Sequence, residues 1–350
     1  MINVDYLIVG NGLAGTLLAF EMLDHGLDFK ILVSKDKSKA SLVAAGMFNP
    51  VVFKRMTKSW MVDELLPVMK GKYIELERIL NKNFFFEKKI LKPLSEQEMI
   101  LWKQRRMDSD FMNYIQSVDK VKKYDQLKNT AGYGIVNNAG FVNLIEFLSG
   151  AEAFFRERRY IIDYAFPFDK YDPEKKSLQI ESYNFSKIIF CEGYHVTRNY
   201  FFNFLPLRPV KGEILEIFAP ELSEEFILNK KVFVLPVGDH IFKVGSTYEW
   251  EDLSEMPTDE GKNAILGQLR ELITVHFEVI NHVAGIRPTV SDRRPILGVH
   301  PTWNQLYIFN GLGTKGVMLG PYFALEMVKL LSVKNYSVQK EVQIERFINK

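Results

Sequence analysis

This sequence has a single cysteine, a small net charge and no long apolar run. A single cysteine among 350 residues, Cys191, excludes an internal disulfide and a zinc site built on cysteines. The net charge of +2 gives no argument for binding nucleic acid or a membrane surface. No apolar run reaches the roughly 18 residues that a membrane-spanning helix requires. The six histidines have no metal-ligand spacing, and no signal-peptide pattern precedes the first strand. We therefore expect a cytoplasmic protein without a metal site.

The most informative segment is 5–15, where an apolar run of strand length meets three glycines at G-x-G-x-x-G spacing. The pattern predicts a strand over 6–9 and a helix over 12–23. In a dinucleotide-binding turn, Gly10 permits the tight bend, Gly12 lets a pyrophosphate approach the backbone, and Gly15 lets the helix pack on the strand. The pyrophosphate would then bind the free N–H groups at the start of the helix.

A second strand is predicted over 29–33, and the acid that commonly binds the ribose is missing at its end. Ser34 can hydrogen-bond a ribose hydroxyl through its side chain. Asp36 can do so only if the turn is shifted. Lys35 could instead face a 2′-phosphate, which would favour NADP.

The rest of the chain changes character twice. Helical patterns over 60–80 and 95–117 dominate a glycine-poor region, and strand patterns dominate 205–282 around a helix predicted over 259–275. A strand over 305–309, a glycine loop and a helix over 317–331 then form a second nucleotide-type unit. Two such units at opposite ends predict an interleaved α/β fold, with one parallel sheet shared by both ends. The middle supplies an α+β domain with an antiparallel sheet. We expect one domain from 1–58, 140–203 and 284–350, and a second from 59–139 and 204–283.

Four motifs, in this order, resemble the FAD-dependent amine and amino-acid oxidases of the D-amino-acid oxidase superfamily, glycine oxidases in particular. They are the glycine turn at 10–15, the Ala-Ala-Gly-Met segment at 44–47, the Ala-Gly-Ile-Arg-Pro segment at 284–288 with Asp292 and 295–298 after it, and the glycine loop at 311–316. The resemblance extends over nearly the whole chain and implies a Rossmann-like FAD-binding domain.

The resemblance implies bound, non-covalent FAD, because no cysteine lies near the final loop for covalent attachment. Cys191 is expected to be a buried, inert thiol. The strand before Gly193 is suited to pass close to the cofactor. The expected cofactor-binding residues are Gly10, Gly12, Leu13, Ala14, Gly15, Ser34, Lys35, Ala40, Ser41, Ala45, Gly46, Met47, Phe166, Gly193, Gly311, Leu312, Gly313, Thr314, Lys315, Gly316, Val317 and Met318.

The resemblance also implies oxidation of a C–N bond of a small amino acid or secondary amine, by hydride transfer to the flavin and with oxygen as acceptor. Arg287 matches the arginine that fixes a substrate carboxylate, and a planar guanidinium suits that task because it offers two parallel charge-assisted hydrogen bonds. The alternative is a structural arginine paired with Asp292 or a backbone carbonyl. Lys315 would stabilise negative charge on the reduced flavin, or else point to solvent.

Two departures concern the substrate. Thr314 stands where glycine oxidases have a second arginine, and Phe233 replaces a pocket tyrosine. The expected partner is therefore a small molecule with a carboxylate and an amine, although not specifically glycine. One alternative is the oxidase domain that acts on a carboxymethylaminomethyl-type modified tRNA base, with the basic insert at 100–125 as a tRNA contact. Another is a non-catalytic flavin- or NADP-binding protein, supported by Lys35. A membrane partner is not expected.

Overall fold

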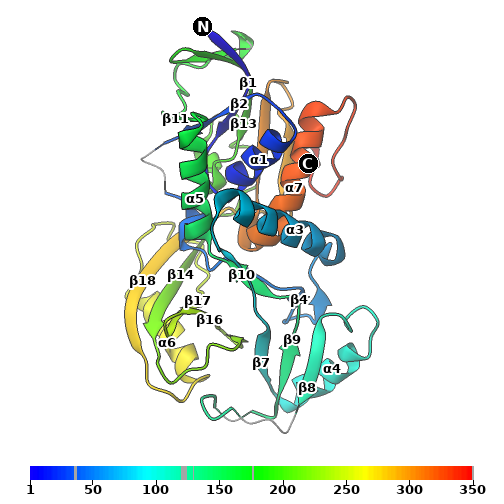
Figure 1. Cartoon of the computed structure of the whole chain (residues 1–350), viewed down its shortest axis with the longest axis vertical. Helices are drawn as coiled ribbons and strands as arrows, with labels where there is room; N and C mark the ends of the chain where they lie inside the picture. Colours follow the sequence, from blue (N-terminus) through cyan, green and yellow to red (C-terminus); the bar gives the residue numbers. More distant parts are fainter. Residues whose placement is uncertain (35–37, 120–123, 129, 176, 349–350) are drawn as a thin grey trace.

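The chain forms two halves, which Figure 1 shows one above the other. The computed structural model describes residues 1–34, 38–119, 124–128, 130–175 and 177–348. The upper half is built on a seven-stranded sheet and the lower half on an eight-stranded sheet.

The seven-stranded sheet is mainly parallel. Its order is β11-β2-β1-β13-β20-β19, and β12 pairs with β13 beside that path. The pairs β11–β2, β2–β1, β1–β13 and β13–β20 are parallel, whereas β12 and β19 are antiparallel to their neighbours. The strands are β1 (Ile2–Val9), β2 (Phe29–Val33), β11 (Ile161–Asp163), β12 (Leu178–Ile180), β13 (Tyr183–Phe190), β19 (Ile296–Val299) and β20 (Leu306–Asn310).

Both faces of this sheet are buried, which explains why its first strand reads as a continuous apolar run rather than an alternating one. Ile8 packs in one cluster with Phe20 and Phe155, whose rings lie 4.7 Å apart. Leu7 and Val9 pack in a second cluster on the other face. The helices that cover the sheet or precede it are α1 (Leu13–Asp24), α2 (Ala40–Val43), α5 (Leu144–Glu157) and α7 (Gly316–Ser332), with the 3₁₀ turns η1 (Pro173–Lys175), η2 (Gly193–Arg198), η3 (Gly313–Lys315) and η4 (Ile344–Phe347).

The eight-stranded sheet has the order β18-β14-β17-β16-β15-β7-β9-β8. All neighbours are antiparallel except β15 and β7, which are parallel. Leu215, Val234 and Leu269 belong to the apolar cluster between this sheet and α6 (Asp259–Arg270). The strands are β7 (Ile90–Leu94), β8 (Ile115–Asp119), β9 (Gly132–Val136), β14 (Val210–Phe218), β15 (Ile227–Asn229), β16 (Phe233–Gly238), β17 (Ile241–Gly245) and β18 (Glu278–Arg287).

Smaller elements join the two halves. The three-stranded sheet has the order β3-β10-β6, and β4 pairs with β5. Helix α3 packs against α7 and α5. These elements are β3 (Met47–Phe48), β4 (Val51–Val52), β5 (Thr57–Lys58), β6 (Phe85–Glu87), β10 (Gly140–Val142) and α3 (Val62–Leu80), whereas α4 (Glu96–Arg106) packs against β7, β8 and β9 of the eight-stranded sheet.

The helix predicted over 95–117 is wrong beyond its first half. It begins as expected, with a capping box in which Ser95 accepts from the Glu98 N–H. It ends at Arg106, because the Asp108 side chain accepts from the Asp110 N–H at 3.0 Å and so favours a turn. Ile115 then opens β8. The glycine-poor region therefore contributes strands to the eight-stranded sheet, and the helix predicted over 259–275 ends at Arg270.

The interleaved α/β fold predicted from the two nucleotide-type units is confirmed. The chain contributes β1 and β2 to the parallel sheet, leaves it, returns for β11 to β13, leaves again, and returns for β19 and β20. The boundaries expected for the two domains stay a prediction.

Candidate active site

A cavity of about 440 Å³ lies where three parallel strands end. Val9 at the end of β1, Cys191 directly after β13 and Asn310 at the end of β20 all line it. Ligands of parallel α/β sheets bind at this edge, because the loops that follow the strands converge there. The Asn310 amide donates to the Gly193 carbonyl at 2.9 Å and so ties two of these loops together.

The glycine turn forms one wall of the cavity. Gly10 has a φ of +104°, and a Cβ added to Gly15 would lie 1.9 Å from the Gly10 carbonyl oxygen. Only glycine allows this approach of α1 to the strand. The N-cap residue Gly12 offers no side-chain cap and the first turn has no acidic residue. The start of α1 therefore presents N–H groups and positive dipole to the cavity, and the Leu13 N–H donates to Ser41 Oγ at 3.3 Å.

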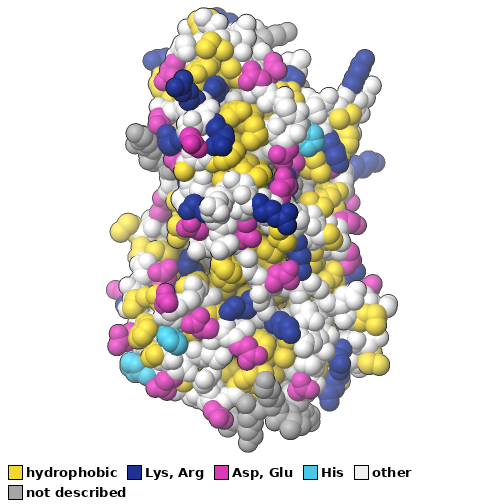
Figure 2. Space-filling model, viewed as in Figure 1, with side chains coloured by type: hydrophobic (Ala, Val, Ile, Leu, Met, Phe, Trp, Pro, Cys, Tyr) yellow, Lys and Arg dark blue, Asp and Glu magenta, His cyan; other side chains and the backbone are white. Residues whose placement is uncertain are grey.

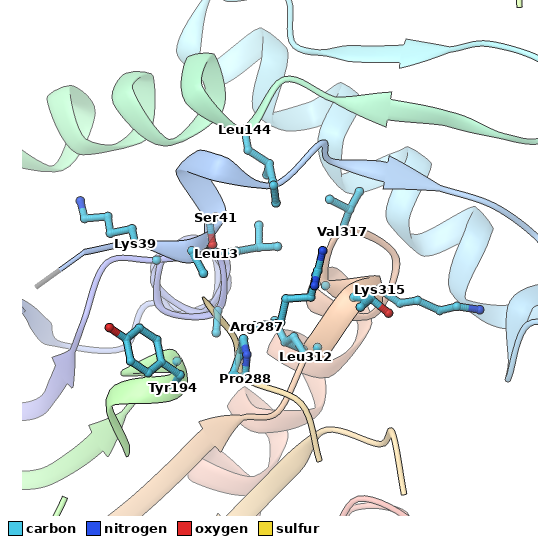
Figure 3. Close-up of a pocket in the computed structure, with 18 of the residues that line it drawn as sticks. Leu13, Lys39, Ser41, Leu144, Tyr194, Arg287, Pro288, Leu312, Lys315 and Val317 are labelled. Atoms are coloured by element: carbon cyan, nitrogen blue, oxygen red, sulfur yellow. Dashed lines mark hydrogen bonds between the residues drawn. The ribbon is translucent and has the colours of Figure 1, made fainter. Parts of the chain in front are cut away.

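Most of the expected cofactor-binding residues line this one cavity. Gly15 and Gly311 do not line it, and Lys35 and Asp36 lie outside the described residues. Figure 3 shows Leu13, Ser41, Arg287, Leu312 and Val317 gathered round the same space. The expected residues that line it are Gly10, Gly12, Leu13, Ala14, Ser34, Ala40, Ser41, Ala45, Gly46, Met47, Phe166, Gly193, Leu312, Gly313, Thr314, Lys315, Gly316, Val317 and Met318.

Arg287 enters the same cavity from the end of β18, between the two halves. Its Nη2 donates to Ser246 Oγ at 2.9 Å and its Nη1 donates to the Thr247 carbonyl at 3.3 Å. Among the described residues, no carboxylate lies within ion-pair distance of it. Of the two alternative partners predicted, Asp292 pairs instead with Arg346 at 2.8 Å, whereas a backbone carbonyl, that of Thr247, does accept from Arg287. Partial burial lowers the pKa of Arg287 from its usual value, so its charge lacks full solvation and favours an anionic ligand.

Lys315 lines the cavity and does not point to solvent, and its expected role toward the flavin stays a prediction. Figure 3 shows its side chain extending away from the other labelled residues, and its Nζ donates to Ser59 Oγ at 2.6 Å. Ser59 in turn donates to the Asn49 carbonyl at 2.9 Å. Burial, with the cations Arg294 and Arg293 nearby, lowers the pKa of Lys315 to about 8. The ammonium group thus ties the final loop to the segment before α3 rather than facing solvent.

Two residues that sequence reasoning missed lie against Arg287. Ser246 accepts its hydrogen bond, and the Tyr248 ring centre lies 4.8 Å from the guanidinium carbon. Both line the cavity, as do Phe233 and Thr314, the two departures from the glycine oxidase pattern. The Gly-Ser-Thr-Tyr run at 245–248, which begins at the last residue of β17, could have suggested polar cavity residues. Its distance in sequence from Arg287 gave no indication that the two are in contact.

The chemistry of the remaining groups is limited. Cys191 is a free, buried thiol, and burial raises its pKa well above the usual value, so the reactive thiolate is disfavoured. In the ranges that the structure describes, no three His, Cys, Asp or Glu side chains gather in a way that could hold a metal ion.

None of the helices within the described part of the chain is both long and apolar enough to cross a membrane.

The residues present fit FAD. The uncapped start of α1 suits a pyrophosphate, and Ser34 lines the cavity directly after β2, as does Phe166 after β11. The final loop and Met47 line the same cavity, and their expected contact with the flavin stays a prediction.

A sequence model of the FAD-dependent oxidoreductase family (DAO) matches residues 5–330. The chain is 29% identical to a glycine oxidase of Pseudomonas aeruginosa over 131 residues, which is 37% of this chain and 36% of that protein. It is 22% identical to the tRNA 5-methylaminomethyl-2-thiouridine biosynthesis bifunctional protein MnmC of Campylobacter jejuni subsp. doylei over 311 residues, 85% of this chain and 46% of that protein. The chain thus spans less than half the length of these curated relatives.

The fold is similar to that of solved oxidases. The crystal structure of glycine oxidase from Geobacillus kaustophilus superposes with a TM-score of 0.80 and 20% identity, and 97% of each chain is covered.

Proposed function

The chain belongs to the FAD-dependent oxidoreductase family, and from that premise we propose that it oxidises a C–N bond of a small amino acid or secondary amine, with dioxygen as final acceptor. Bound FAD, held non-covalently, supplies the two-electron acceptor. The family match favours this enzyme over a non-catalytic flavin- or NADP-binding protein.

One observation carries the substrate proposal: Arg287 faces the cavity with its charge unpaired among the described residues. The Ser246 and Thr247 contacts fix the guanidinium plane and leave its other N–H groups for the ligand. A carboxylate bound there would be held by two parallel charge-assisted hydrogen bonds. Holding the carboxylate fixes the neighbouring carbon relative to the final loop, and this positioning is the protein's main contribution to the rate.

The chain's other residues set the surroundings of that carbon. Ile214 and Phe233 supply apolar wall, which strengthens electrostatic contacts by excluding water. The final loop leads into the N-terminus of α7, whose dipole favours negative charge beside it. Thr314 supplies no second cation, so we propose a substrate with one carboxylate bound by one arginine.

The decisive experiment is anaerobic reduction of the bound flavin, followed by absorbance, across amino acids, secondary amines and hydroxy acids. We expect bleaching by carboxylate-bearing amines and none by the matched hydroxy acids. A colourless purified protein that takes up no FAD would contradict the cofactor assignment. Bleaching by hydroxy acids alone would contradict oxidation of a C–N bond.

Oxidation of a carboxymethylaminomethyl-type base in tRNA is the second candidate, favoured by the match to MnmC over 85% of the chain. Figure 2 shows acidic and basic side chains interspersed on the viewed face. In the basic insert, Arg105 pairs with Asp108 at 3.3 Å, and Lys120, Lys122 and Lys123 lie outside the described residues. Steeply salt-dependent tRNA binding would support this candidate, and its absence would remove it.

A further inference from the structure

The segment 246–258, between β17 and α6, contacts the cavity in two places. At its start, Ser246 and Tyr248 lie against Arg287, as described above. Near its end, a Glu255 carboxylate oxygen accepts a hydrogen bond from the Tyr194 hydroxyl at 2.8 Å and another from Ser38 Oγ. The segment therefore spans from the proposed carboxylate anchor to a second group of residues on the cavity wall.

Ser38 and Tyr194 both line the cavity, and they come from different loops of the FAD-binding half. Ser38 precedes α2, and Tyr194 lies in η2 after β13. The His195 ring also contacts the Ser38 carbonyl at 3.2 Å, so the two loops meet at this point. Burial, and next the Glu255 carboxylate, raise the pKa of Tyr194, which keeps its hydroxyl protonated as a donor.

Buried charges on β14 hold the segment in place. Lys211 is fully buried, and its Nζ pairs with Asp252 and lies 3.2 Å from Ser254 Oγ. Its backbone exchanges two hydrogen bonds with Glu249, at 2.8 and 3.0 Å. Glu213 accepts from the Thr258 N–H at 3.0 Å and from its hydroxyl at 2.8 Å. The placement of Glu255 thus depends on the half that carries Arg287.

We infer that Glu255 is a positioning residue of the cofactor site, which holds Ser38 and Tyr194 against the adenosine end of bound FAD. The end of β2 lacks the acid that commonly orders this end, and Glu255 supplies a carboxylate from the opposite half of the molecule. A carboxylate acceptor binds hydroxyl donors about twice as strongly as a neutral one. Release of FAD then requires that this contact between the halves opens.

The test measures FAD binding directly and does not depend on turnover. Apoprotein is titrated with FAD, and the dissociation constant is read from the change in flavin fluorescence. We expect Glu255→Ala to raise the constant about tenfold and Glu255→Gln to raise it less, because glutamine keeps an acceptor without the charge. Glu251→Ala, an exposed glutamate of the same segment, is the matched control and should stay within twofold of wild type.

Tyr194→Phe should reproduce part of the effect of Glu255→Ala, because it removes one of the two hydrogen bonds that the carboxylate accepts, and the double variant should bind FAD no more weakly than Glu255→Ala. Thermal unfolding of the apoproteins should coincide. The inference is overturned if Glu255→Ala binds FAD within twofold of wild type, if the effects of the two variants multiply, or if apoprotein stability falls in parallel with affinity. The last result would show that Glu255 stabilises the contact between the halves and has no role in binding the cofactor. None of these outcomes bears on the oxidation of amines.

Discussion

Removal of the Arg287 guanidinium tests the proposed anchor most directly. The side chain is partly buried, lines the cavity and has hydrogen bonds only to Ser246 and Thr247 among the described residues. Arg287→Ala therefore removes a cation without leaving a buried carboxylate unpaired. Any loss of affinity for an anionic ligand then reports on the ligand's own contacts.

The magnitude follows from the two charge-assisted hydrogen bonds that a carboxylate would lose. Truncation of one partner in such a buried pair costs about 3 kcal/mol, within the measured range. At about 1.4 kcal/mol per tenfold change, this is roughly a 100-fold rise in the dissociation constant. Arg287→Lys keeps the charge and loses the planar fork, so we expect a rise of roughly tenfold.

The assay titrates the FAD-loaded protein with acetate, an unreactive carboxylate, and follows the absorbance spectrum of the bound flavin. Acetamide, which has the same shape without the charge, serves as the control ligand. Wild type should prefer acetate, and Arg287→Ala should lose that preference with its FAD content unchanged. Arg158→Ala, at an exposed arginine on the end of α5, is the matched control. If Arg287→Ala binds acetate within threefold of wild type, the anchoring role is wrong.

Three further changes have expected outcomes. Gly212→Ala should weaken acetate binding at least tenfold while FAD stays bound, because the added Cβ would lie 1.9 Å from the guanidinium anchor; unchanged acetate titration would contradict this. Gly15→Ala should yield protein without flavin, since its Cβ would lie 1.9 Å from a backbone carbonyl, whereas Gly71→Ala in α3 meets nothing within 4 Å and should retain full flavin content. Lys315→Met should alter the pH dependence of apoprotein stability. The folded-state pKa of the lysine is lowered from 10.5 to about 8, so its destabilisation is complete below pH 8 and disappears as the pH rises to 10.5. The free energy of unfolding of wild type, measured with urea, should therefore rise by at most about 3 kcal/mol over that range relative to the variant.

Local patterns predicted the cofactor side of the site because their constraints are local. The turn at Gly10 and Gly15 depends on residues five apart, and the following helix is continuous with it. The final loop and Arg287 are likewise set by the strands directly before them. Most residues chosen from the loops after the parallel strands line one cavity because those strands end at one edge, whereas Arg287 reaches the same cavity from β18 of the other sheet.

Contacts between distant segments were not predictable in this way. The position of Glu255 depends on Lys211 and Asp252, which only the pairing of β14 with the segment after β17 brings together. Gly212 lies beside the Arg287 side chain because its strand, β14, pairs with β18, the strand that ends at Arg287. Lys315 contacts Ser59 across 256 positions of sequence. Sequence periodicity reports burial, and it carries no information about which strand becomes the neighbour.

The strand order of the parallel sheet also constrains how the protein is made. Strand β20 lies between β13 and β19, yet it ends at Asn310. After β1 and its glycine turn have left the ribosome, most of the polypeptide must still be synthesised before β20 can pair with β13. Until then, β13 in the FAD-binding half has an unpaired edge. Most of the folding of this half must therefore follow translation rather than accompany it.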